Sequence, residues 1–191
     1  MSEKILLKIG WFFTLIVTFF IWTFLLWDHY HGGVPSHHIL ANKDMPAISN
    51  WWGGLLLPIL TWFLLYRIQI RIISQSKKNP ETSVYTKCIL YRFSASLLFG
   101  IFLSAFFTFG YADFSGYLVM ALFPLAILVP IYRAECLLGF VIAMTFTFGT
   151  ILPMLIGSLF VLMGAFIYLV LRPGIVYVLS RVGATTGIGN N

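Results

Sequence analysis

The stretch ILLKIGWFFTLIVTFFIWTFLLW, residues 5–27, decides the fold class. As an α-helix it would extend about 34 Å, enough to cross the hydrocarbon core of a bilayer with some tilt. Lys4 precedes it, and Trp22, Trp27 and Tyr30 at its end carry the amphipathic rings that are typical of a membrane interface. A signal peptide has a shorter apolar core and a small-residue cleavage site, so we interpret this run as a retained transmembrane helix.

The rest of the chain has the same character, because 60% of its 191 residues are hydrophobic and only 9% are charged. A soluble domain carries about a quarter charged residues, since its surface must stay hydrated. A lipid bilayer is therefore the expected surrounding, and the length suits one integral membrane domain over residues 1–191. The net charge of +6 does not predict nucleic-acid binding, because the basic residues stand at helix ends rather than on a solvated face.

Further apolar segments follow at about residues 51–73, 87–110, 117–132, 136–148 and 153–171. Together with the first run they predict an all-α fold, a polytopic membrane helix bundle with six transmembrane helices. The last two segments share a stretch without any charged residue, which we divide at the turn signal of residues 149–153. The alternative is five crossings plus a re-entrant hairpin, because residues 136–148 are short for a full crossing.

The distribution of basic residues predicts the orientation. With both the N- and C-termini in the cytoplasm, eleven of the twelve Lys and Arg residues fall inside and only Lys43 falls outside. This predicts a multi-pass protein of the cell membrane in which residues 28–49 form an extracytoplasmic polar loop. Residues 74–86 would form a cytoplasmic loop, and residues 173–191 a cytoplasmic C-terminal tail.

The external loop holds every histidine of the chain and two of its three aspartates. These residues are Asp28, His29, His31, His37, His38 and Asp44. Imidazole and carboxylate are the usual ligands of zinc, and imidazole also binds copper. The loop therefore predicts a site for a transition metal ion, zinc or copper first, with Asp28 and the four histidines as ligands. In a catalytic site, Asp28 or Asp44 would act as a general base on metal-bound water.

The conformation of the loop decides which ligands can meet. Asp28 and His31 share a face if the first helix continues one turn past the interface, whereas His29 and His31 share a face only in an extended segment. We expect a short interfacial helix over His37 to Lys43. The spacing matches no standard zinc motif, and histidines that only bond to backbone or water are the plain alternative.

Two other acidic residues stand near helix ends. Asp113, beside Tyr111 in the second external loop, is expected to cap the fourth helix. Glu135 lies between two apolar runs, and we expect it at the membrane edge, paired with Arg133 or exposed to the interface. The sequence places no ionisable residue near the middle of a helix, which argues against a proton-coupled pump.

Three functional classes follow. In the first, the metal-binding loop belongs to an integral membrane protein, and one form of this class is a metal-dependent enzyme on a lipid-like or peptide substrate. In the second, the protein is a permease or channel for a neutral or apolar solute. In the third, it is a non-catalytic membrane subunit that docks a partner through the loop. Gly157 and Gly164 permit close helix contact, within the chain first and in a homo-oligomer second. The sequence leaves the enzymatic status open.

Overall fold

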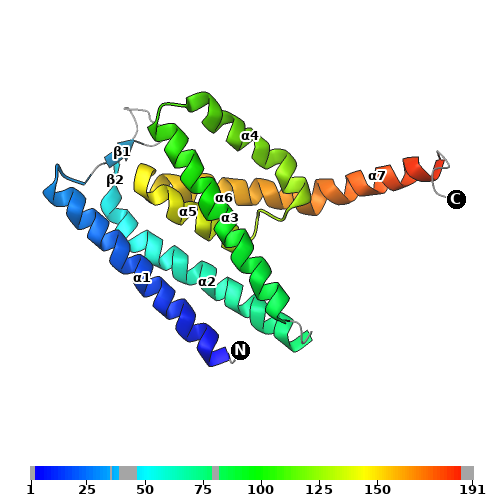
Figure 1. Ribbon diagram of the computed structural model, residues 1–191, viewed down its shortest axis with the longest axis horizontal. Coiled ribbons are helices and arrows are strands. Elements are labelled where there is room, and N and C mark those ends of the chain that lie inside the picture. Colours follow the sequence, from blue (N-terminus) through cyan, green and yellow to red (C-terminus); the bar gives the residue numbers. More distant parts are fainter. Residues whose placement is uncertain (1–2, 35, 39–46, 79–81, 186–191) are drawn as a thin grey trace.

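The computed structural model describes residues 3–34, 36–38, 47–78 and 82–185. The chain folds into a helical bundle with a short two-stranded ribbon at one end, here called the ribbon end (Figure 1). The main helices are α1 (Glu3–Tyr30), α2 (Gly53–Lys78), α3 (Thr82–Thr108), α4 (Ala112–Leu128), α5 (Ala134–Phe148) and α6 (Ile151–Phe166). A π-helical turn, η3 (Ile167–Leu171), continues α6 into α7 (Arg172–Thr185).

Within the described residues, four helical stretches are long and apolar enough to cross a membrane. They are Lys4–Tyr30, Asn50–Lys77, Ser83–Thr108 and Ile151–Val178. The prediction of an all-α, multi-pass membrane protein is confirmed at this level. Helices α4 and α5 form where the sequence predicts helices, but they have only 17 and 15 residues. At about 26 Å and 22 Å they are shorter than a hydrocarbon core of about 30 Å.

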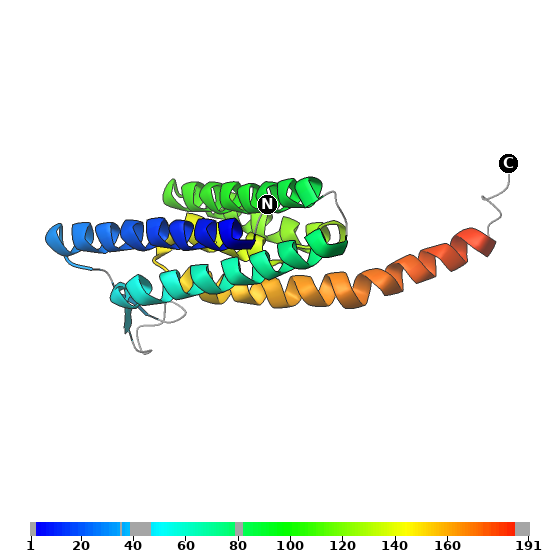
Figure 2. The same cartoon turned by 90° about the horizontal axis from the view of Figure 1, so that it is seen from below.

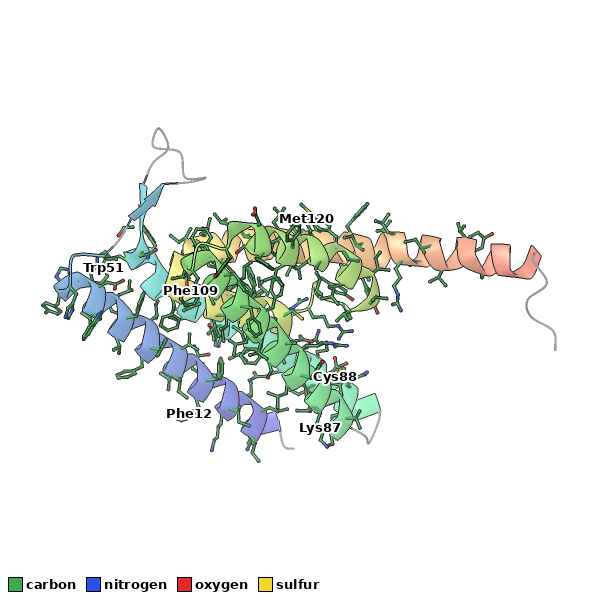
Figure 3. The ribbon with its side chains drawn as sticks, turned by 45° about the horizontal axis from the view of Figure 1, so that its top comes forward. Phe12, Trp51, Lys87, Cys88, Phe109 and Met120 are labelled. Carbon is green, nitrogen blue, oxygen red and sulfur yellow. The ribbon has the colours of Figure 1, made fainter. Side chains whose placement is uncertain are left out.

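Large apolar side chains cover the outside of the bundle. Phe12, Phe109 and Met120 are 67%, 76% and 66% exposed, and Figure 3 shows them on α1, in the turn after α3 and on α4. Such a surface would be unfavourable in water but is the expected surface of a protein whose solvent is lipid.

The closest helix contact joins α3 to α5, which run parallel to each other. A Cβ atom at Gly139 would lie 2.3 Å from the Ser96 hydroxyl oxygen and 2.5 Å from the Phe93 carbonyl oxygen. One turn further along both helices, a Cβ at Gly100 would lie 2.7 Å from the Cβ of Ala143. Small residues therefore let these two backbones approach, as is common between membrane helices.

Helices α1 and α2 form an antiparallel hairpin. The buried Gln69 amide nitrogen donates a hydrogen bond of 2.8 Å to the Leu6 carbonyl oxygen. At the ribbon end, Trp22 and Trp51 pack with ring centroids 6.3 Å apart. Trp11 and Trp62 pack further along the two helices, with ring centroids 6.5 Å apart, so the hairpin combines polar and aromatic contacts.

Helix α5 contacts Asn50, just before α2, at one of its ends and α2 itself at the other. Gly149, its C-cap, has a φ of 70°, and a Cβ there would lie 2.1 Å from the Asn50 side-chain oxygen. Only glycine satisfies both the positive φ and the close approach. At the other end of α5, Glu135 pairs with Arg71 of α2. Helix α5 thus extends between the ribbon end and the arginine-bearing part of α2.

The ribbon corrects one prediction. Strands β1 (Ser36–His38) and β2 (Ala47–Ser49) pair antiparallel, with His37 opposite Ile48. The expected interfacial helix is therefore wrong over residues 37–38, while residues 39–43 lie outside the described residues. After the ribbon, Ser49 caps the short 3₁₀ helix η2 (Asn50–Trp52), because its hydroxyl oxygen accepts from the Trp51 N–H at 3.4 Å.

Two helix ends differ from the prediction because of proline. Helix α4 ends at Leu128 rather than near residue 132, since Val129, with φ −119° and ψ 136°, takes the extended conformation favoured before Pro130.

The residues expected to form a C-terminal tail are helical as far as Thr185, and residues 186–191 lie outside the described residues. The π turn η3 ends two residues before Pro173, and such a wider turn accommodates a residue without an N–H. Figure 2 shows α7 projecting beyond the other helices.

The α3–α5 contact gives a stability prediction. Gly139→Ala should lower the free energy of unfolding by about 1–3 kcal/mol, because the new methyl group meets the rigid Phe93 carbonyl. Thermal unfolding of the detergent-purified protein measures the change. Gly116→Ala in α4 is the control, since a Cβ there meets nothing within 4 Å and alanine favours the helix. Equal melting temperatures for the two variants would contradict the packing argument.

Candidate functional site

The structure places the predicted metal ligands of the first helix in its last turn and just after it. Helix α1 continues past Trp27 to Tyr30, as required for Asp28 and His31 to share a face. The His31 ring nitrogen Nδ1 lies 2.9 Å from the Trp27 carbonyl oxygen, and because a carbonyl only accepts, Nδ1 donates. The His31 ring also stacks on the Trp27 indole at a centroid distance of 3.9 Å.

His29 makes different contacts. Its ring packs edge-on against Tyr30 and Trp51, with centroids 5.3 Å and 5.8 Å apart. Across the described part of the chain, no three His, Cys, Asp or Glu side chains come together to hold a metal ion. His37 and His38 are described as the backbone of β1, and Asp44 lies outside the described residues. The metal site, and the catalytic roles of Asp28 and Asp44, therefore stay predictions.

The connection between α3 and α4 also differs in detail from the prediction. Tyr111, not Asp113, is the N-cap of α4, and no side chain forms a capping hydrogen bond there. Asp113 lies in the first turn of the helix. Its carboxylate stabilises α4 through the helix dipole instead of through a cap.

A buried charged cluster lies away from the ribbon end, and the sequence did not predict its pairing. Glu135, at the start of α5, is 0% exposed. Its Oε2 accepts a hydrogen bond from Nη2 of Arg71 on α2, and its Oε1 lies 3.6 Å from Nη1 of Arg92 on α3. One carboxylate therefore connects three helices. We call Arg71, Arg92, Arg133 and Glu135 the arginine cluster.

The expected pairing of Glu135 with Arg133 is not what the structure shows. Arg133 is the N-cap of α5, and its Nη1 lies within hydrogen-bonding distance, 3.4 Å, of the Tyr85 hydroxyl oxygen on α3. Arg133 and Glu135 are two residues apart at the start of a helix, where side chains do not share a face. The guanidinium groups of the neighbouring helices reach the carboxylate instead.

A cavity of about 340 Å³ begins beside this cluster and runs between α3, α4, α5 and α6. Tyr91, Arg92, Ser96 and Cys136 line it where it adjoins the cluster. Apolar side chains line the remainder, among them Phe99, Leu122, Phe140, Phe160 and Val161. The cavity therefore combines one cationic group with a largely hydrocarbon wall.

The signal for the cluster was present in the sequence as chain direction. Arg71 stands late in a helix that leaves the ribbon end, and Arg92 and Glu135 stand early in helices that run toward it. All three were expected on the cytoplasmic side, but as separate helix-end residues. Only the packing of α5 between α2 and α3 brings their charges together.

The fold and this arrangement define a multi-pass integral membrane protein with a buried ion-paired cluster and an adjoining apolar cavity. Comparison with protein families, with curated proteins and with solved structures finds no match to the chain.

The ion pair predicts a large stability effect. Arg71→Met should lower the free energy of unfolding by about 3 kcal/mol, because it leaves the fully buried Glu135 carboxylate with only the 3.6 Å contact to Arg92. The matched control is Arg67→Met, one helical turn earlier on α2, where the side chain is exposed. The double variant Arg71→Met/Glu135→Met should recover part of the loss. Chemical or thermal unfolding in detergent measures all three, and equal losses for Arg67→Met and Arg71→Met would refute the assignment.

Proposed function

We propose that this protein binds a lipid-like ligand in the cavity between α3, α4, α5 and α6. The observation that carries the proposal is the division of the cavity wall into a polar region at Arg92 and Ser96 and an apolar remainder. A lipid-like molecule has the same division, because it carries a polar head group on hydrocarbon chains. The volume of about 340 Å³ falls in the range of about 300–1,000 Å³ that is usual for small-molecule sites.

The cavity lies between helices that differ in how closely they pack against each other. Helices α3 and α5 are fixed to each other by the close contacts at Gly139 and Gly100. Helix α4 covers the cavity with Leu122 and Leu125, followed by its C-cap Val129, and Figure 1 shows the helix set apart from α5. A ligand chain would therefore fill the space between a rigid helix pair and a separate covering helix.

The same proposal includes six membrane crossings with both termini in the cytoplasm. The distribution of basic residues supports the orientation. The contacts of α5 support its crossing, because one end lies against Asn50, just before α2, and the other pairs with Arg71, late in α2. A re-entrant hairpin would turn back before α5 reached one of these two contacts. Residues 28–49 would then be extracytoplasmic, and the arginine cluster would lie near the cytoplasmic side of the cell membrane.

Filling the cavity tests the proposal. Ala95→Trp places a large side chain in the cavity from an exposed position on α3, so it should reduce copurifying lipid at least severalfold without unfolding the protein. Leu98→Trp is the control, because Leu98 is 52% exposed on the same helix and does not line the cavity. Lipid extracted from washed, detergent-purified protein is quantified by mass spectrometry.

Equal lipid retention by the two tryptophan variants would refute binding in this cavity. Flux of a neutral solute through liposomes that contain the protein would then favour the permease class. A stable copurifying membrane protein, lost when the loop of residues 28–49 is replaced, would favour the subunit class.

We infer a second candidate function, metal binding by the extracytoplasmic loop, from one feature of His31. Its Nδ1 donates to a backbone carbonyl, which is the arrangement that orients many metal-binding histidines. The Nε2 atom is then the nitrogen left for a metal, and the His31 side chain is exposed. His29 and Asp28 lie in the preceding turn, and β1 carries His37 and His38. The remaining ligands would have to come from β1 and from Asp44.

The metal proposal has a direct test. Purified protein incubated with zinc or copper and then desalted should retain about one metal ion per chain, measured by elemental analysis, because four imidazoles can supply a full tetrahedral set. His31→Ala should lower retention strongly. Tyr30→Ala is the control, since it changes the adjacent exposed ring without removing a ligand. Absence of retained metal in the unaltered protein would end this proposal.

A further inference from the structure

We propose that the ligand of the cavity carries a phosphomonoester head group, and that Arg92 binds it. This inference rests on the proposed lipid-like ligand and adds the chemistry of its polar end. It assigns to Arg92 a role in recognition beyond its contact with Glu135.

Arg92 has hydrogen-bonding capacity that the described residues do not use. Its guanidinium group has five N–H donors, and its one polar contact among those residues is the ion pair of 3.6 Å to Glu135. The side chain is 19% exposed and lines the cavity. A guanidinium group that faces a cavity with free donors is suited to bind two oxygens of one anion at the same time.

The charge of the cluster indicates how much negative charge the ligand brings. Arg71, Arg92 and Arg133 carry +3 and Glu135 carries −1, which leaves +2 beside the cavity. All four charged groups interact electrostatically with the thiol of Cys136, which lines the cavity. A phosphomonoester, with a charge of about −1.5 to −2 at neutral pH, balances this excess. A fatty-acid carboxylate would balance half of it, and an uncharged head group none.

The N-terminus of α5 adds to the positive electrostatic potential beside the cavity. Arg133 caps this 15-residue helix without a side-chain hydrogen bond to the first turn. The helix dipole therefore places partial positive charge beside Arg92 and Cys136, at the cavity region that would receive the head group. The hydrogen bond from Arg71 occupies Oε2 of Glu135, and the remaining oxygen Oε1 lies 3.6 Å from Arg92, beyond hydrogen-bonding distance, so the Arg92 N–H donors stay available.

Head-group selectivity of the purified full chain tests the inference. Phosphatidic acid and diacylglycerol with the same fluorescent acyl chains are titrated against the protein in detergent, and binding is followed by fluorescence polarisation. Phosphatidic acid should bind about tenfold more tightly or better, because charge-assisted hydrogen bonds form only with the phosphate. Arg92→Gln should abolish this preference, because it weakens the binding of phosphatidic acid about tenfold or more relative to that of diacylglycerol.

Two variants control the result. Arg67→Gln removes an exposed arginine of α2 outside the cluster and should keep the full preference for phosphatidic acid. Arg92→Lys keeps the charge but loses the planar fork, so it should lose part of the preference while retaining more stability than Arg92→Gln. Arg92→Lys provides the measurement of head-group preference if Arg92→Gln does not fold.

Each remaining outcome is decisive. Equal affinity of the unaltered protein for the two lipids would overturn the head-group assignment but leave the lipid-like ligand in place. Binding of neither lipid would overturn the proposed function itself. Oleate binding as tightly as phosphatidic acid would overturn the requirement for a phosphomonoester. Displacement of labelled phosphatidic acid by an equal concentration of inorganic phosphate would overturn the lipid source and assign Arg92 to free phosphate.

Discussion

The Glu135 carboxylate, fully buried between Arg71 and Arg92, is the interaction on which the arrangement of this bundle depends. A carboxylate removed from water is strongly unfavourable unless ion pairs and hydrogen bonds replace its hydration. Its partners come from two other helices, so the charge is compensated only when α2, α3 and α5 share one register. The close contact at Gly139 fixes that register by packing, and the ion pair selects it by charge.

The cluster and the cavity form one feature because they share Arg92. On one side Arg92 faces Glu135, and on the other it lines the space under α4. An excess of positive charge beside an apolar wall resembles the surroundings of an amphiphile at the boundary between head groups and hydrocarbon. The proposed ligand follows from this juxtaposition rather than from any single residue. The short helix α5 is central to it, since its first turn supplies both Glu135 and Cys136.

At the ribbon end, aromatic packing rather than ion pairing fixes the side chains. There the hairpin of α1 and α2 ends in aromatic contacts, with His29 against Trp51 and His31 stacked on Trp27. These contacts give both histidines defined positions without a metal ion. Ring packing thus orders the described start of the histidine-rich loop, and metal coordination that involves His37 and His38 stays a prediction.

The sequence by itself determined the helical membrane class, the approximate positions of α1 to α6 and the turn at Gly149. These features are local, because apolar runs, proline and glycine act within a few residues of where they stand. Tertiary structure alone decided that Glu135 pairs with Arg71 and Arg92, and that a cavity adjoins them. Such pairings depend on the relative height and rotation of packed helices, which hydropathy along one chain does not encode.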